Sequence, residues 1–347
     1  MSIAIRETPI EPVPVDAAAT PVSVQERSVT IPVTEAGLAQ ANALFQQDWW
    51  LNAASPGGWD AVTVEQGGAC VARLAFAVRR HAGITALTQP PLTPFLGPWL
   101  RMAEGKANTR LAREHELLGK LADALPPYDV FAQDFHPQYA NWLPFHWRGF
   151  RQTTRYTYVI DDLDDLDQTW AGLHESTRRE VRKARKCVTV DPGDDLETFI
   201  ELNRMTYRRQ GRSLPYDPAI LRRVDTACAR QGARRVLIAR DGTGRAHAGL
   251  YLVWDQSSAY YLMGGLDPER RSSGAMSLLM WQAIRLAATV TRSFNFEGSM
   301  IQPIERFFRG FGARQVPYSH IRTSRTLKGR IAEAGHELLR STWKRNP

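Results

Sequence analysis

The stretch from residue 294 to residue 313 constrains the fold of this chain more than any other. Phe294-Asn295-Phe296-Glu297 alternates apolar and polar residues and stops at Gly298-Ser299, which predicts a short strand that runs into a turn. Apolar residues at helical spacing follow, and Gly312 ends the helix that they predict: Ile304, Phe307, Phe308 and Phe311. A strand, a turn and a short aromatic helix in this order indicate a mixed α/β fold.

The rest of the chain repeats an α/β order. Helical periodicity covers 35–50, 108–125, 164–186, 197–210, 219–231 and 274–289, and strand patterns cover 28–32, 60–64, 69–79, 235–239, 246–254 and 258–265. The segment 128–159 is aromatic and strand-like, and the four prolines within 90–99 exclude regular structure there. We therefore expect two similar α/β units with a seam near Arg151: a disordered leader (1–27), a first unit (28–150), a second unit (151–324) and a basic amphipathic C-terminal helix (325–347).

Charge and cysteine usage narrow the function classes. The net charge of +8 favours an anionic partner, for which nucleotide phosphates, RNA and anionic lipid all qualify. Cys70, Cys187 and Cys228 lie far apart with no CxxC pair, and the eight histidines form no ligand pattern, so we expect no metal. The absence of a signal peptide, and of any apolar run near the roughly 18 residues that cross a bilayer, predicts a cytoplasmic protein.

These motifs resemble the GNAT superfamily of acyltransferases, in its branch of FemAB-like aminoacyltransferases and related acetyltransferase-like proteins. Three pieces carry the resemblance: the basic helix 176–186, the strand Tyr260-Tyr261-Leu262-Met263-Gly264-Gly265, and the strand-to-turn element Phe294 to Gly298. It covers about 161–322, and the first half only by architecture. The resemblance implies two tandem GNAT-like units with mixed sheets flanked by helices, and an acyl-CoA co-substrate, with acetyl-CoA as the expected donor and no bound cofactor.

The sequence departs from the coenzyme A pattern of this superfamily in two places. The pyrophosphate loop matches Arg271-Ser272-Ser273-Gly274-Ala275-Met276, in which Met276 takes the last small position. Phe308 stands where many members carry a tyrosine that acts as general acid. Fem-type enzymes share such departures because their donor is aminoacyl-tRNA, so tRNA stays open as a partner.

Two residues are candidates for catalysis. Glu297, at the end of the strand, is placed to accept a proton from an attacking amine, and burial beside Phe294 and Phe296 would raise its pKa toward the working range. The alternative is a carboxylate that caps the following turn. Tyr318 is the candidate proton donor in place of the missing tyrosine, or else a half-buried strand tyrosine.

Binding residues fall into three groups. The resemblance assigns the donor to Leu262, Gly264 and Gly265 of the strand and to Arg271, Ser273, Gly274 and Ala275 of the loop, where free backbone N–H groups meet phosphate. The acceptor or its phosphates would meet Arg178, Arg182 and Lys183 of the basic helix, unless these form a solvated face. Tyr207 and Arg209, at the end of another helix, are candidates for the acceptor cleft.

The C-terminal helix carries an apolar stripe: Leu327, Ile331, Leu338, Leu339 and Trp343. We expect this stripe to pack against the protein, and peripheral contact with an anionic membrane is the alternative.

Three functions remain open at this stage. The first is a GNAT-type N-acyltransferase that moves an acyl group to an amine acceptor, such as a cell-envelope or saccharide precursor. The second is a tRNA-dependent aminoacyltransferase of Fem type. The third is a silent GNAT-like module that binds anionic ligands.

Overall fold

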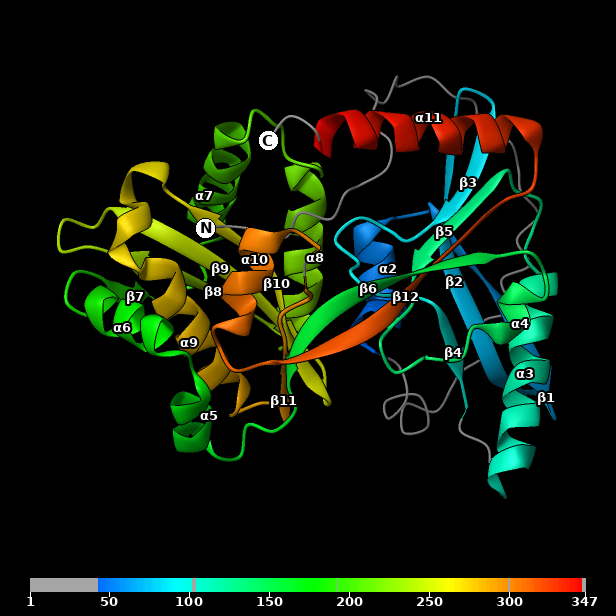
Figure 1. The fold of residues 1–347 in the computed structure, drawn as a ribbon, viewed down its shortest axis with the longest axis horizontal. Coiled ribbons are helices and arrows are strands. Elements are labelled where there is room, and N and C mark those ends of the chain that lie inside the picture. Colours follow the sequence, from blue (N-terminus) through cyan, green and yellow to red (C-terminus); the bar gives the residue numbers. More distant parts are fainter. Residues whose placement is uncertain (1–42, 102–103, 192, 299, 345–347) are drawn as a thin grey trace.

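The computed structural model describes residues 43–101, 104–191, 193–298 and 300–344, with side chains through Gly335. The expected leader (1–27), the expected strand at 28–32 and the first part of the expected helix at 35–50 lie outside these ranges. Figure 1 shows two lobes joined by a pair of long strands.

The first half of the described chain forms one lobe. Its strands are β1 (Trp59–Gln66), β2 (Ala69–His81), β3 (Ile84–Thr88), β4 (Pro98–Leu100) and β5 (Val130–Asp134). Its helices are η1 (Leu44–Gln46), α2 (Asp48–Ala54), α3 (Ala107–Asp123) and α4 (Leu143–His146).

The second half begins at residue 151. Its strands are β6 (Arg151–Ile160), β7 (Thr189–Asp191), β8 (Arg234–Arg240), β9 (Ala246–Trp254), β10 (Ser258–Leu266), β11 (Ser293–Asn295) and β12 (Arg314–Ser324). Its helices are α5 (Leu166–Gly172), α6 (Glu175–Ala184), α7 (Leu196–Arg209), α8 (Pro218–Arg230), η2 (Pro268–Ser273), α9 (Ala275–Ala287), α10 (Gln302–Arg309) and α11 (Leu327–Lys344).

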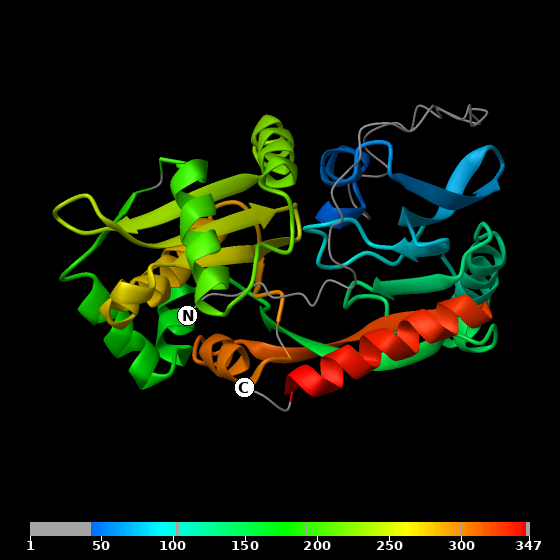
Figure 2. The same ribbon diagram turned by 90° about the horizontal axis from the view of Figure 1, so that it is seen from above.

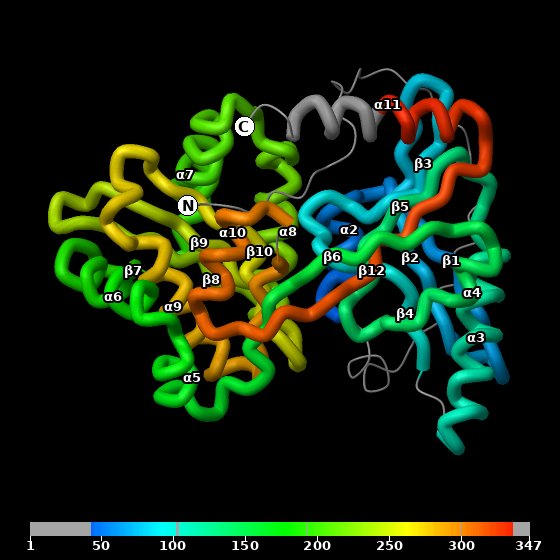
Figure 3. Tube along the Cα trace, in the orientation of Figure 1, coloured from blue at the N-terminus to red at the C-terminus, as the bar shows by residue number. Residues whose placement is uncertain are grey.

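The strands of the described residues form one twelve-stranded mixed sheet in the order β1-β2-β3-β5-β12-β6-β11-β10-β9-β8-β7, with β4 on β2. β6 and β12 pair antiparallel from Arg151–Arg322 to Val159–Arg314 and bridge the two lobes, as the tube in Figure 3 also shows. Within the second half, β6 pairs with β11. β12, which ends the second half, pairs with β5 of the first, so a strand of the second half extends the sheet of the first lobe.

Helices cover both faces of the second lobe. One core lies between the sheet and α6, α9 and α10, and includes Val181, Leu279 and Phe308. A second core lies on the opposite face, between the sheet and α7 and α8. This second core also takes in Phe45 and Trp50 from the start of the described chain, so the two halves share buried apolar surface.

Most of the elements predicted from periodicity are present within one to three residues. The predicted helix at 35–50 is wrong over 43–47, because Ala43 and Gln47 have extended backbone angles and only the turn η1 lies between them, whereas 48–50 are helical as the start of α2. Tertiary contacts explain this. The Phe45 ring meets Tyr260 at 4.9 Å, and the backbone N–H of Leu44 donates to Asp255 at 2.9 Å. Within the segment predicted to be strand-like, 143–146 is instead the helix α4, with Pro144 in its first turn where proline is tolerated.

Candidate functional site

The sheet of the second lobe opens where β10 and β11 separate. The two strands pair in parallel from Ser258–Ser293 to Tyr260–Asn295. Immediately beyond, the register of β10 with β9 shifts between Tyr261 and Met263, so Leu262 lies in a β-bulge. A bulge bends its strand and leaves backbone groups outside the regular ladder. β10 and β11 therefore separate at Leu262 to Gly265, the segment that the sequence assigned to donor binding.

Glu297 lies at this opening, directly after β11. Its side chain is 8% exposed, and its φ of +60° is in the left-handed region that a non-glycine residue rarely adopts. The Glu297 N–H donates to Asn295 Oδ1 at 2.8 Å, and the same oxygen accepts the Thr157 hydroxyl at 2.6 Å. Unusual backbone angles of this kind cluster at functional sites, because the surrounding structure has to hold them. Asn295 and Thr157 hold this turn.

Gly298 continues the turn in a position that only glycine fits. Its φ is +75°, and a Cβ there would lie 2.0 Å from the carbonyl oxygen of Tyr156 and 2.4 Å from the Cα of Thr157. The chain therefore passes directly over β6 as it leaves the sheet. This close approach fixes where the Glu297 carboxylate stands.

The negative charge of Glu297 contributes to the raised pKa of two buried tyrosine hydroxyls. Burial raises the pKa of Tyr207, near the end of α7, and the Glu297 carboxylate raises it further against the opposing effect of Arg212. Burial also raises the pKa of Tyr260 well above its usual value, with Asp255 and Glu297 adding to the effect. Both hydroxyls therefore stay protonated at neutral pH and can donate. Tyr207, which was expected near an acceptor cleft, thus lies within the electrostatic range of Glu297.

Tyr260 also connects the site to the first lobe. Its hydroxyl lies 3.3 Å from His136 Nε2, and the Phe95 ring packs on both His136 and Tyr318. Burial lowers the pKa of His136 to about 4, so this imidazole is neutral at pH 7. Tyr318, the expected proton donor, lies on β12 opposite Arg155, at the middle of the strands that join the lobes.

The glycines of β10 are explained by the packing of α7. The Gly264 carbonyl accepts from Asn203 Nδ2 at 2.7 Å. A Cβ on Gly265 would lie 2.4 Å from the backbone nitrogen of Asn203. Thr206 of the same helix accepts from the Leu266 N–H at 3.0 Å. These contacts hold α7 against β10 in the part of β10 that no longer pairs with β11.

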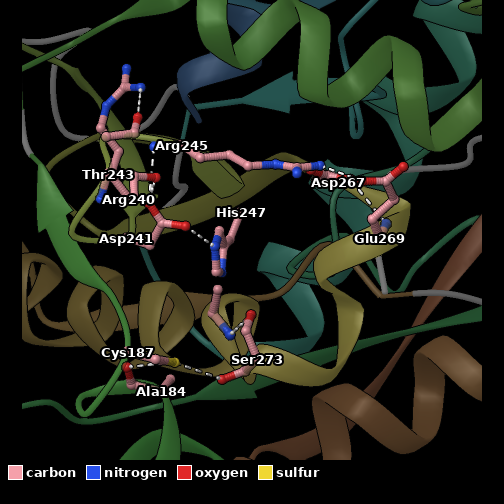
Figure 4. A network of polar contacts seen from close by, with 12 residues as sticks. Ala184, Cys187, Arg240, Asp241, Thr243, Arg245, His247, Asp267, Glu269 and Ser273 are labelled. Carbon is pink, nitrogen blue, oxygen red and sulfur yellow. Dashed lines mark hydrogen bonds and ion pairs between the residues drawn. The ribbon is translucent and has the colours of Figure 1, made fainter.

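The loop between β10 and α9 is held by the polar network in Figure 4. Arg245 joins Asp267 and Glu269, each at 2.6 Å, and Asp267 caps η2 by accepting the Glu269 N–H at 2.9 Å. Beside it, His247 contacts Asp241 at 3.0 Å. These contacts fix the position of the candidate pyrophosphate loop from the β8–β9 turn.

The start of α9 is the part of this loop that would receive phosphate. Gly274 is the N-cap residue, with φ +76° and no side-chain cap, and Ser273 accepts from the Ala275 N–H at 3.2 Å. Arg271 is exposed nearby, and the charge of Arg271 adds to burial in lowering the pKa of Arg209 at the end of α7. Two guanidinium groups that repel each other favour a bound anion between them. Arg209 and Arg271 thus influence each other electrostatically, and both are candidates for contact with a bound anion.

The same loop fits a coenzyme A pyrophosphate poorly on its other side, where α6 covers it. A Cβ on Gly274 would lie 2.6 Å from the Glu180 carbonyl oxygen and 3.0 Å from Glu180 Oε2. Lys183 donates to the Ser272 carbonyl and lies 3.6 Å from Glu180. A carboxylate at this position repels an incoming phosphate. Met276, the large residue in the loop pattern, is buried in the core beneath.

The remaining basic residues of α6 are engaged locally. Arg178 pairs with Glu175 at 2.8 Å and donates to the Ala171 carbonyl, and Arg182 reaches the same glutamate at 3.3 Å. Of the three basic residues expected to bind substrate, the structure places Lys183 at the loop and pairs Arg178 and Arg182 within their own segment. Phe308 is buried against Phe296 and Tyr261 and carries no exchangeable proton.

Sequence reasoning missed three residues of this site. Tyr260 and His136 lie 124 positions apart, and no local pattern could join them. Glu180 was hidden among the basic residues of its helix. Its spacing of three from Lys183 indicated only a helical ion pair.

Among the described residues, no group of three or more His, Cys, Asp or Glu side chains could hold a metal ion. In the part of the chain that the structure describes, no helix combines the length and hydropathy needed to cross a membrane.

Comparisons with known proteins agree with this geometry. Residues 149–297 match the family model described as an acetyltransferase (GNAT) domain. No curated protein matches the sequence.

Two solved structures share the fold over nearly their whole lengths. FemX has a TM-score of 0.61 at 15% identity, covering 82% of this chain and 94% of that chain. The C-terminal domain (DUF2156) of a putative lysylphosphatidylglycerol synthetase from Agrobacterium fabrum has a TM-score of 0.52 at 14% identity, covering 88% and 94%.

Residues 149–297 therefore form a GNAT-type acetyltransferase domain. The chain as a whole has the fold of FemX, and the resemblance drawn from the sequence is confirmed. Identity of 15% shows the fold alone, so the reaction has to be argued from the site.

Proposed function

We propose that the chain transfers an acyl group to an amine, with Glu297 as the general base. The observation that carries this proposal is the buried carboxylate in a left-handed turn at the opening of the sheet, beside two protonated phenols. An amine attacks only after it has lost its proton, and a carboxylate at hydrogen-bond reach of the nitrogen, directly or through one water, accepts that proton.

The other steps use groups at the same opening. Backbone N–H groups at the Leu262 bulge would stabilise the oxyanion that forms as the amine adds to the acyl carbon. Tyr207 or Tyr260 would return a proton to the leaving group, the role first assigned to Tyr318. Both hydroxyls lie within the influence of Glu297, whereas Tyr318 lies at the seam between the lobes.

The test of the base is Glu297→Gln, which keeps the shape of the side chain and removes its basicity. Turnover should fall about 10² to 10³-fold while donor affinity stays within about threefold. Comparable losses of both would remove Glu297 from the base role. Asp161→Asn, at an exposed pair with Arg314, is the matched control and should leave both values unchanged.

The first donor to test is acetyl-CoA, which the GNAT domain favours. Its phosphates would lie between Arg209 and Arg271 and at the start of α9. Calorimetric titration with acetyl-CoA, and with coenzyme A as control, should show saturable binding near −8 kcal/mol if the affinity is micromolar. Absence of heat with both ligands would exclude this donor.

The coverage of Gly274 by α6 favours a second donor, aminoacyl-tRNA. Glu180 and Lys183 close the side of the loop where a compact pyrophosphate would approach. A tRNA presents its acyl group on a ribose and its phosphates along an extended surface, so it does not need that pocket. Activity in a tRNA-containing extract should disappear after ribonuclease treatment. No turnover with either donor, and no effect of Glu297→Gln, would indicate a silent binding module.

The acceptor class follows from the same proposal. An amine on a cell-envelope or saccharide precursor suits a site with a base and two phenols. All three cysteines are free thiols, which supports the cytoplasm as the proposed compartment.

A further inference from the structure

Helix α11 lies along the outside of the molecule, across one edge of the first lobe (Figures 1 and 2). Its first two turns present Leu327 and Ile331 to solvent, at 73% and 64% exposure. These two residues are four positions apart and share one face of the helix. The expectation that the apolar stripe packs against the protein is therefore wrong for both of them.

Polar contacts hold α11 by its opposite face. Just before the helix, Thr326 Oγ1 donates to Asp129 at 2.6 Å. Glu333 accepts from Ser324 at 2.8 Å and pairs with Arg322 at 3.1 Å. Gly329 lies so close to β5 that a Cβ there would stand 2.5 Å from the Asp129 carbonyl oxygen. The helix is thus docked without using Leu327 or Ile331, and these residues have no role in holding it.

The charges around the exposed stripe are cationic. At 100° per residue, Lys328 and Arg330 flank the line from Leu327 to Ile331 on its two sides. The two carboxylates that contact this end of the helix are paired, Glu333 with Arg322 at 3.1 Å and Asp129 with Lys328 at 3.1 Å. The Arg330 side chain makes no ion pair within the described residues. The end of β2 adds the exposed Arg80, and Lys328 donates to the Gly83 carbonyl of the β2–β3 turn.

We propose that this face of α11 docks on an anionic lipid surface, with Leu327 and Ile331 in the interface and Arg330 at the level of the headgroups. Aliphatic residues on one helix face between long basic side chains are the arrangement that interfacial helices use. A second copy of the chain fits less well, since a stable dimer buries about 800 Å² on each partner and two side chains offer a small part of that area. The proposal does not depend on the identity of the acyl donor.

The test measures partition of the full-length protein onto vesicles. Vesicles of phosphatidylcholine and phosphatidylglycerol, mixed about three to one, should bind the wild type, and pure phosphatidylcholine should bind it at least about tenfold more weakly. The double variant Leu327→Ser, Ile331→Ser should lower binding to the anionic vesicles by about tenfold or more. Arg330→Gln should lower it about fivefold and weaken its dependence on salt.

Two controls keep the outcome decisive. Leu111→Ser removes an apolar residue of α3 that is 48% exposed, and it should bind vesicles as the wild type does. Ile331→Trp should bind a few-fold more tightly, which a variant with a disrupted helix would not do. Equal partition onto neutral and anionic vesicles, or wild-type binding by the double serine variant, would overturn the proposal. Concentration-dependent dimers that vanish in that variant would also overturn it, by assigning the stripe to a second copy.

Discussion

Asp134 and Glu297 stand beside the two strands that join the lobes, Asp134 against β12 and Glu297 against β6. In the antiparallel pair β6–β12, Tyr318 lies opposite Arg155 at the centre. His320 follows Tyr318 by two residues on β12, and Thr157 follows Arg155 by two residues on β6. Asp134 of β5 pairs with His320. β11 pairs with β6 as far as Asn295–Val159, and Gly298 lies over Tyr156 and Thr157, so Glu297 stands beside β6. Each of the two strands that join the lobes therefore has one acidic residue beside it.

The two carboxylates differ in what surrounds them. Asp134 is buried and held by His320 at 2.8 Å and Arg155 at 3.3 Å. Glu297 stands in a left-handed turn among phenols. We infer that the acidic position of the first half joins the lobes and that of the second half serves the chemistry.

The matched pair of variants Asp134→Asn and Glu297→Gln should separate these roles. Asp134→Asn leaves the Arg155 charge without its buried partner, so the free energy of unfolding should fall by about 3 kcal/mol while turnover of the folded enzyme changes little. Glu297→Gln should do the reverse, with a stability change within about 1 kcal/mol. Urea denaturation and initial rates measure the two effects. A loss of activity in Asp134→Asn as large as in Glu297→Gln would contradict this division.

Gly298→Ala should destabilise the protein more than other glycine substitutions. The new methyl group would meet the Tyr156 carbonyl at 2.0 Å in a backbone conformation that disfavours any side chain. Backbone strain and steric overlap together should lower the free energy of unfolding by at least about 3 kcal/mol. The control is Gly242→Ala, in a turn where a Cβ meets no atom within 4 Å. Thermal unfolding of the two variants compares them, and equal melting temperatures would show that β6 is not so closely approached.

The order of elements was predictable from periodicity, because each lobe builds its strands and helices from local patterns such as the turn at Gly67-Gly68. The pairing of β12 with β5 of the first half was not, since the pairing of Asp134 with His320 joins residues 186 positions apart. Glu297 was found because a strand that stops at glycine has a local signature. Glu180 was missed because its importance comes from packing on Gly274, in a helix whose composition indicated only positive charge.

Glu180→Ala tests whether α6 restricts the donor. Removal of this carboxylate should raise coenzyme A affinity about tenfold, because a negative charge beside the start of α9 opposes bound phosphate. Glu175→Ala, in the first turn of the same helix, removes an equal charge that pairs with Arg178, and it should change the affinity little. Calorimetric titration compares the three proteins. Equal affinities in all three would contradict a restricting role, and no binding by any would move the phosphate site away from Arg271 and Gly274.

His136 should make stability depend on pH at the junction of the lobes. Burial holds its pKa near 4, below the usual 6.5, so the unfolded chain binds a proton between these pH values while the folded chain does not. The stabilisation of the folded state by this difference is complete above pH 6.5 and is lost as the pH falls toward 4, by about 2 to 3 kcal/mol. His136→Gln lacks this titrating group, so its free energy of unfolding should change less with pH over this range. Urea denaturation at several pH values measures the difference, with His81→Gln, at an exposed position, expected to follow the wild type. Parallel curves for His136→Gln and the wild type would show that His136 takes up its proton as readily in the folded protein as in the unfolded chain.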